Sequence, residues 1–206
     1  MKHEATKIPR KVGRPLSFDR EAALKEAMLL FWRYGYEATS LSQLTAAMGI
    51  TPPSLYAAFG DKKRLFLEAV DRYMALPITV PGDIEAMSAR EAVWFMFREA
   101  ATRLTGTETP PGCMLTSSAM NCSDSASDVQ AALAKIRCGI EGAIRARIQR
   151  DIGAGVLAKD TDATSLASLA TAVMQGMSTQ SRDGADRAKL LAMAKVSMRA
   201  WPPEAP

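Results

Sequence analysis

Thiol and imidazole groups, the side chains best suited to nucleophilic, redox or metal chemistry, are few in this chain of 206 residues. The three cysteines, Cys113, Cys122 and Cys138, match no Cys-x-x-Cys spacing of a metal or redox site. The single histidine, His3, lies in a basic N-terminal segment outside every predicted helix. A Cys–His or Ser–His pair needs both partners on one fold, so we expect no enzyme, no cofactor and no metal site.

Cys113 nevertheless leaves alternatives open. It follows Pro111 and Gly112 and is predicted to start a helix, whose dipole favours the reactive thiolate. Such a thiol could serve a small helical enzyme, which the missing histidine disfavours. Alternatively, Cys113 or Cys122 could sense oxidants or electrophiles in a DNA-binding regulator. A buried structural thiol is the third alternative and requires no chemistry.

Positive charge is concentrated near the N-terminus. Residues 1–64 hold 11 Lys or Arg and 6 Asp or Glu, whereas residues 65–206 hold 15 and 16. The net charge of +4 therefore comes from the first third of the chain. This asymmetry is typical of a protein with a separate nucleic-acid-binding module, although a solvated basic face produces the same pattern.

Apolar residues form no uninterrupted stretch of about 18, the length that a membrane-spanning helix needs. The first 14 residues are polar and basic and lack the apolar core of a secretory signal. We therefore expect no membrane partner and a cytoplasmic location.

Helix signals run through the whole chain, and no segment shows the two-residue alternation of a strand, so we expect an all-α fold. Polar caps and glycines divide the first 75 residues into four helices. The predicted caps and stops are, in order, Asp19 and Gly35, Ser40 and Gly49, Thr51 and Gly60, and Asp61. The first helix is expected to bury one face, made of Ala23, Ala27, Leu30, Phe31 and Tyr34.

Two short helices, Leu41 to Met48 and Pro52 to Phe59, are joined by a turn that contains Gly49. Ser40 and Gln43 form the capping box of the first, and Pro52 occupies the first position of the second, where its missing N–H does no harm. This arrangement is the helix-turn-helix pattern, whose second helix enters the major groove of DNA. A generic helical hairpin in an α-bundle is the alternative.

The stretch from Gly49 to Lys62, GITPPSLYAAFGDK, resembles the TetR family signature G-(I/V)-x-x-x-(S/T)-L-Y-x-x-F-x-x-K, and the similarity covers about residues 17–75. The resemblance implies an all-helical fold with a three-helix DNA-binding domain and a helical ligand-binding and dimerisation domain. It also implies a homodimeric repressor that leaves an inverted-repeat operator when a small molecule binds. We assign residues 1–16 to a basic disordered arm, 17–62 to the helix-turn-helix domain and 63–206 to the second domain.

The resemblance also implies DNA contacts. Pro52, Pro53 and Ala57 match base-facing positions of the recognition helix, and Tyr56 and Lys62 match phosphate contacts. Ser42 and Gln43 match positions that face the groove or the phosphates. The complete predicted set within these helices and their caps is Ser40, Ser42, Gln43, Thr51, Pro52, Pro53, Ser54, Tyr56, Ala57 and Lys62.

Three cations of the N-terminal arm, Arg10, Lys11 and Arg14, complete the predicted DNA contacts. Gly13-Arg14-Pro15 resembles the core of the hooks that enter the minor groove. An arginine inserted into a narrow A·T-rich minor groove meets concentrated negative potential. A disordered tail without contacts is the alternative.

Five further helices are predicted in the second domain, at about 86–103, 113–120, 124–152, 162–182 and 186–201. Asp124 or Ser127 is expected to cap the third. The last two carry broad apolar stripes that either pair with a second copy in a four-helix bundle or cover the monomer's own core. Candidate ligand contacts, which could equally be core, are Trp94, Phe97, Met114, Met120, Ile140 and Met174. Few charges lie near them, so we expect a neutral, mostly apolar effector.

Overall fold

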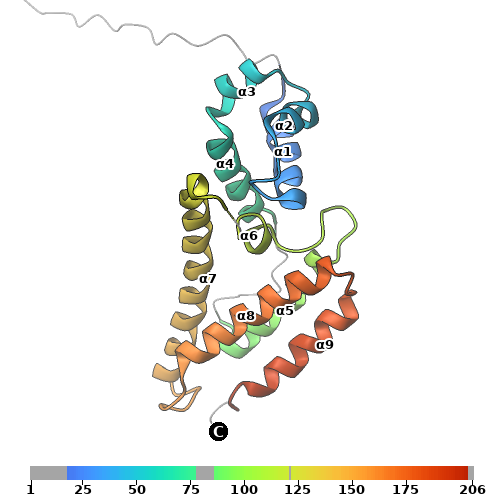
Figure 1. Ribbon diagram of the computed structural model, residues 1–206. Coiled ribbons are helices and arrows are strands. Elements are labelled where there is room, and N and C mark those ends of the chain that lie inside the picture. The colour runs from blue at the N-terminus through green and yellow to red at the C-terminus, as the bar shows by residue number, and fades with distance from the viewer. Residues whose placement is uncertain (1–17, 78–85, 121, 204–206) are drawn as a thin grey trace, which may run out of the picture.

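The structure is a computed structural model that describes residues 18–77, 86–120 and 122–203 (Figure 1). Within these residues it is helical throughout and contains no strand, which confirms the all-α prediction. The helices are α1 (Arg20–Tyr34), α2 (Leu41–Met48), α3 (Pro52–Phe59), α4 (Lys62–Met74), α5 (Ala89–Leu104), α6 (Met114–Ser117), α7 (Ser127–Gly153), α8 (Ala163–Arg182) and α9 (Arg187–Ser197). None of the helices described is both long and apolar enough to cross a bilayer.

The first three helices begin and end, and the fourth begins, where their caps predict. Side chains of Asp19, Ser40, Thr51 and Asp61 each accept a backbone N–H in the first turn of the helix that follows. The capping box is complete, because the Gln43 side chain also accepts the N–H of Ser40. Local side-chain hydrogen bonds therefore determine these boundaries.

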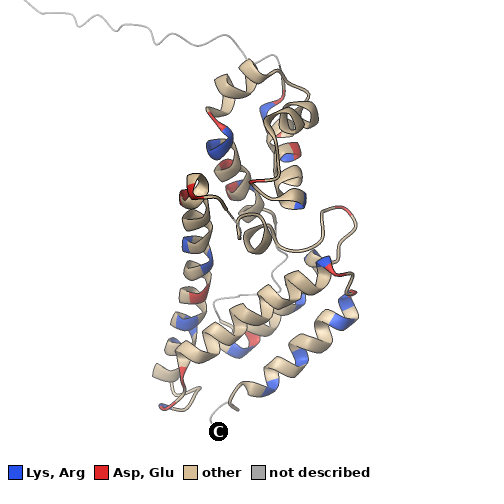
Figure 2. Ribbon diagram, in the orientation of Figure 1, with Lys and Arg blue, Asp and Glu red and all other residues tan. Residues whose placement is uncertain are grey.

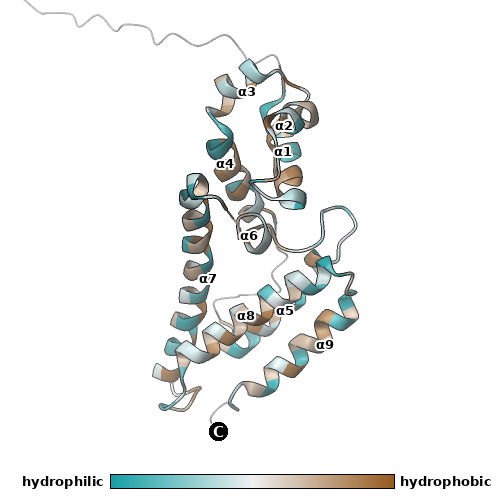
Figure 3. Ribbon diagram, viewed as in Figure 1, coloured by the Kyte–Doolittle hydropathy of each residue, from teal (hydrophilic) through white to brown (hydrophobic). Residues whose placement is uncertain are grey.

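Helices α1–α4 share one hydrophobic core, and we call this part of the molecule the head. Phe31 of α1 meets Phe66 of α4 edge to face, with ring centroids 5.0 Å apart. Figure 3 shows hydrophobic segments on both helices. The predicted position of Tyr34 in this core is wrong, since its exposed fraction is 52%. The buried face of α1 is shifted toward Trp32, which leaves Tyr34 beyond its edge.

Helices α5, α7, α8 and α9 enclose a second core, and we call this part the body. Fully buried side chains at its centre include Phe97, Ile148 and Leu190. The segment around α6 lies between the body and the head, where Met114 and Leu115 join the head core.

Four helix boundaries outside the head differ from the sequence-based expectation. The last helix, expected over 186–201, ends at Ser197 and is followed by a 3-10 turn, Met198–Ala200. Helix α5 begins at Ala89 rather than near residue 86, because Ser88 and Glu91 form a capping box that the prediction missed. The short helix expected over 113–120 is confined to four residues, Met114–Ser117. Neither Asp124 nor Ser127 caps α7; a 3-10 turn, Asp124–Ala126, leads directly into it.

Candidate DNA interface and cavity

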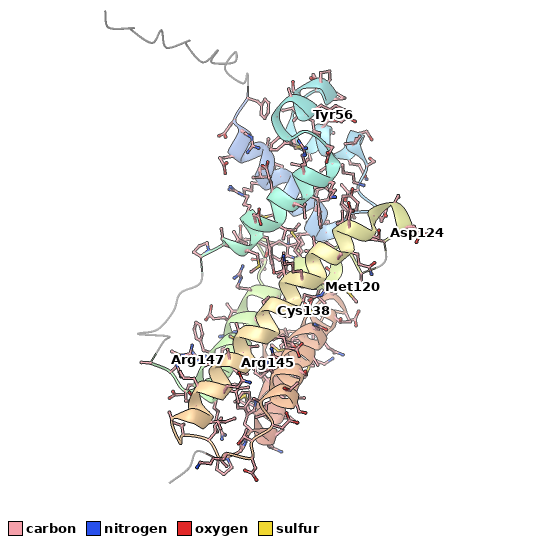
Figure 4. The ribbon with its side chains drawn as sticks, turned by 90° about the vertical axis from the view of Figure 1, so that its left-hand side faces the viewer. Tyr56, Met120, Asp124, Cys138, Arg145 and Arg147 are labelled. Carbon is pink, nitrogen blue, oxygen red and sulfur yellow. The ribbon has the colours of Figure 1, made fainter. Side chains whose placement is uncertain are left out.

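The recognition helix α3 lies at the tip of the head, and Tyr56 marks this end of the molecule in Figure 4. Leu55 and Phe59 are buried and attach the helix to the head core. The predicted base-facing residues Pro52, Pro53 and Ala57 are all exposed. Neither α2 nor α3 contains a charged residue, as Figure 2 shows, so the surface that these two helices offer to DNA is apolar or neutral.

Hydroxyl and amide groups at the starts of α2 and α3 already have partners within the chain. The Gln43 Oε1 atom accepts the N–H of Ser40 at 2.8 Å, and the hydroxyls of Ser40 and Ser42 lie 3.0 Å apart. The Thr51 and Ser54 hydroxyls likewise pair at 2.9 Å. Bidentate recognition of adenine needs both the oxygen and the nitrogen of a glutamine. With the capping box formed, one lone pair of the Gln43 Oε1 is occupied, and bidentate recognition of adenine would need the second.

The cations at the start of α4 differ in their availability. The Lys62 ammonium lies 4.5 Å from the centre of the Tyr36 ring, and its burial lowers the pKa of Lys62, an effect that Glu37 opposes. Lys63 forms an ion pair with Asp128 of α7. The Arg64 side chain is 74% exposed, although its Nε lies 3.8 Å from the Asp61 Oδ2.

Arg64 is therefore the most accessible of the three cations, and sequence reasoning did not single it out. The family signature ends at Lys62 and drew attention to that residue instead. Arg64 folds toward Gly60, where an added Cβ would lie 2.9 Å from the Arg64 Cδ. Since Gly60 ends α3, Arg64 is a further candidate phosphate contact next to the recognition helix.

Arg10, Lys11 and Arg14 lie outside the described residues, so their predicted contacts with DNA stay predictions. The other predicted contacts are gathered on α2, α3 and their caps, apart from Lys62 on α4. Ser54 and Lys62 are half-buried, whereas the remaining members of this set are exposed.

A cavity of about 230 Å³ opens where α4, α5, α7 and α8 approach the α6 segment. Two of the predicted ligand contacts, Ile140 and Met174, line it. Most other lining residues are apolar, but Glu99, Arg103 and Arg137 also reach the wall. Helical periodicity did not reveal these three, because charged residues on amphipathic helices are ordinarily assigned to solvent.

The other four predicted ligand contacts do not line this cavity. Phe97 and Met114 are fully buried in the two cores. Trp94 borders a separate surface hollow beside Lys195 of α9. Met120 is 53% exposed beside α7 (Figure 4). All four are apolar and belong to helices that the sequence predicts to form the pocket. Only the packing of the helices decides whether such a residue lies in the core, at the surface or in the cavity wall.

Cys113 lines the cavity and is held on two sides. Its Sγ accepts a hydrogen bond from the Tyr73 hydroxyl at 3.3 Å, and its N–H donates to the Ser178 hydroxyl at 2.8 Å. Burial raises the pKa of Tyr73, and the neighbouring Cys113 thiol raises it further. Cys122 is half-buried, and burial followed by the charge of Glu37 raises the pKa of its thiol. Cys138 is exposed on α7 (Figure 4).

Operator DNA in which thymine is replaced by uracil should bind more weakly. An exposed face made of Pro52, Pro53 and Ala57 can offer only apolar contact, which the C5-methyl of thymine accepts. Uracil removes only this methyl and leaves base pairing intact, so we expect a loss on the order of 1 kcal/mol per important contact. Fluorescence anisotropy with both DNAs measures it. Equal affinity would show that α3 reads bases through water or DNA shape.

Two family profiles match the chain: "Bacterial regulatory proteins, tetR family" over residues 23–69, and "Tetracyclin repressor-like, C-terminal domain" over residues 89–195. The HTH-type transcriptional repressor ComR of Escherichia coli (strain K12) is 35% identical over 193 residues, which span 92% of each chain. BdcR, another HTH-type transcriptional repressor of this organism, is 36% identical over 105 residues, 50% of this chain and 53% of BdcR.

A solved structure also resembles the chain closely. It holds a cysteine mutant of the TetR family transcriptional regulator CifR in complex with 26-base-pair double-strand operator DNA. The TM-score is 0.85 at 42% sequence identity, and the match covers 92% of this chain and 100% of that one.

Proposed function

The chain belongs to the TetR family of DNA-binding transcriptional regulators, and we propose that it is a homodimeric repressor released from an inverted-repeat operator by a small molecule. The cavity carries this proposal, because Tyr73 and Met74 of α4 form part of its wall. The same helix contributes Leu65 and Phe66 to the head core. A molecule in the cavity would therefore touch the helix on which the DNA-binding helices rest. We place the protein in the cytoplasm, where its operator is accessible.

Helix α8 supports the proposed dimer. From Ala163 to Ser181 it contains no charged residue, and Figure 2 shows it almost without blue or red. Yet one side of this stretch is solvent-exposed in the single chain, including Leu169, Ala172 and Thr179. A long exposed helix face without charge is typical of an interface. Helices α8 and α9 of two copies would form a four-helix bundle.

The effector we infer is mostly apolar and carries one polar group. Aliphatic, aromatic and thioether side chains dominate the wall, and the cavity volume of about 230 Å³ suits a small organic molecule. Arg137 is held in place because its guanidinium donates to the carbonyl oxygen of Leu115 at 2.7 Å. Its remaining N–H groups, or Glu99 and Arg103, could orient a polar substituent.

Selection from a random DNA library tests the proposal. We expect the purified protein to enrich an inverted repeat whose half-sites lie about one helical turn apart or somewhat more. Small apolar compounds that raise its melting temperature should release this DNA. An Ala100→Phe variant, which narrows the cavity, should keep DNA binding and lose release. Enrichment of no repeat, or release unaffected by Ala100→Phe, would contradict the proposal.

A thiol-based sensor is the second candidate, favoured by the position of Cys113 in the cavity wall. If the thiols are structural, replacing all three cysteines with serine should leave operator affinity and effector release unchanged. Binding and release are measured by anisotropy before and after treatment with peroxide or a quinone. A wild-type protein that releases DNA on treatment, beside a triple variant that does not, would establish the sensor instead.

A further inference from the structure

Three segments that are distant in the sequence meet where the head joins the body. They are the last turn of α1, the segment Gly112–Ser118 and the last turn of α8. We propose that Arg182, at the end of α8, is a positioning residue that fixes the orientation of the head on the body and thereby the spacing of the two recognition helices. This inference rests on the proposed dimeric repressor.

Arg182 binds the C-terminal end of α1 directly. Its Nη2 donates to the carbonyl oxygens of Trp32 at 3.0 Å and Arg33 at 3.1 Å. Carbonyls in the last turn of a helix lack intrahelical donors, and a cation there also balances the negative end of the helix dipole. One guanidinium thus satisfies two acceptors of the head from a helix of the body.

The path of the Arg182 side chain depends on Gly112. This glycine has φ +83°, and a Cβ added to it would lie 2.8 Å from the Arg182 Cγ and 3.0 Å from its Cδ. The carbonyl oxygen of Gly112 in turn accepts the buried Trp32 Nε1–H at 2.8 Å. Trp32 is therefore held by its backbone to Arg182 and by its side chain to Gly112.

The segment Gly112–Ser118 connects this junction with the cavity. Cys113, Leu115 and Thr116 line the cavity. At the far end of the segment, the carbonyl oxygen of Ser118 accepts the N–H of Tyr36 at 2.7 Å. Both ends of this part of the cavity wall are consequently attached to α1 and the residues that follow it.

The charge pattern of α8 indicates why an arginine is needed here. Arg182 is the only charged residue in this helix. The uncharged remainder of α8 forms the proposed dimer interface. The last turn of the same helix, through Arg182, therefore links that interface to the head of each copy. Without the two hydrogen bonds, each head keeps its own fold but pivots more freely on the body. The dimer then presents its recognition helices at a less well-defined separation.

An Arg182→Met variant of the full-length protein tests this role, since methionine keeps an unbranched stem near Gly112 and removes the hydrogen-bond donors. We expect the dimer mass and the far-ultraviolet circular dichroism to stay the same. Affinity for the selected operator should fall roughly tenfold, within the usual range of coupling between sites. Operators with one base pair inserted or deleted between the half-sites should lose less affinity with the variant than with the wild type.

Arg182→Lys should restore part of the spacing preference, because a lysine keeps the cation but lacks the planar fork. Arg145→Met, an exposed position on α7 (Figure 4), is the matched control and should change nothing. An Arg182→Met variant that binds operators of every spacing with the wild-type affinities would overturn the proposal. So would an equal loss for all spacings, which indicates a merely structural role. Failure of the wild type to select an inverted repeat would instead refute the proposed function.

Discussion

A Gly176→Leu variant should remain folded but become monomeric, and its operator affinity should fall by a factor of about 100 or more. Gly176 lies within α8, where an added Cβ would meet no atom within 4 Å beyond its chain neighbours and the adjacent backbone of its own helix. A glycine inside a helix destabilises it by about 1 kcal/mol relative to alanine. The fold of the single chain does not require a glycine here, and the uncharged face of α8 identifies the neighbour as a second α8 in the proposed dimer.

The size of the effect follows from linkage of two DNA-binding heads. Once one head is bound, the other faces its half-site at a high effective concentration, which increases affinity by about 10²–10⁴ without any new contact. A leucine side chain at the proposed interface separates the two helices and removes this gain. Light scattering at micromolar concentration and anisotropy on the selected operator measure the two consequences.

Gly139→Leu is the matched control, since Gly139 also lies within a helix, α7, and an added Cβ there also meets no atom within 4 Å. This variant should remain dimeric and bind DNA normally. A dimer that persists in Gly176→Leu with unchanged affinity would show that α8 is not at the interface.

Phe66→Ala should unfold the head selectively and abolish operator binding. Phe66 is fully buried, and its ring meets Phe31 at 5.0 Å and Tyr36 at 5.1 Å between centroids. Removal of a buried phenylalanine costs about 3–5 kcal/mol, a large share of the stability of an ordinary domain. The body core contains none of these three residues, so the dimer should survive.

Urea unfolding followed by circular dichroism, with light scattering at each step, measures this selectivity. Phe97→Ala is the counterpart in the body core and should weaken the dimer and effector binding first. If both variants lose dimer and DNA binding together in one transition, the head and the body form a single cooperative unit and the division of the chain is wrong.

The sequence predicts the head better than the body for a physical reason. Helix boundaries in the head depend on capping hydrogen bonds between residues three apart in the sequence, such as Ser40 with Gln43 and Asp61 with Arg64. The start of α7 has no side-chain cap. Distant contacts hold its surroundings instead, including Arg137 with Leu115 and Gln130 with Met120. Such contacts leave no local pattern in the sequence, whereas the start of α5 has one, the capping box of Ser88 and Glu91, that could have been recognised.

The candidate sites show the same limit. Exposed positions on α3 follow from one short helix with a clear apolar face. The cavity is built from five segments of chain, and whether a residue such as Phe97 or Ile140 reaches it depends on packing between helices. The role of Arg182 is equally hard to predict from the sequence. An arginine at the end of a helix ordinarily indicates only solvent exposure and a favourable interaction with the helix dipole.

The uncharged surface of α3 has a consequence for chemically modified DNA. A cytosine methylated at C5 places its methyl group in the major groove, at the ring position where thymine carries one. Pro52, Pro53 and Ala57 are exposed and bear no side-chain group that could distinguish the two bases by their exocyclic oxygen or amine. Such a surface responds to the methyl whichever pyrimidine carries it. Methylation of cytosines within a half-site would then act on this regulator as a change of sequence does, and a methyltransferase could alter its occupancy without any mutation of the operator.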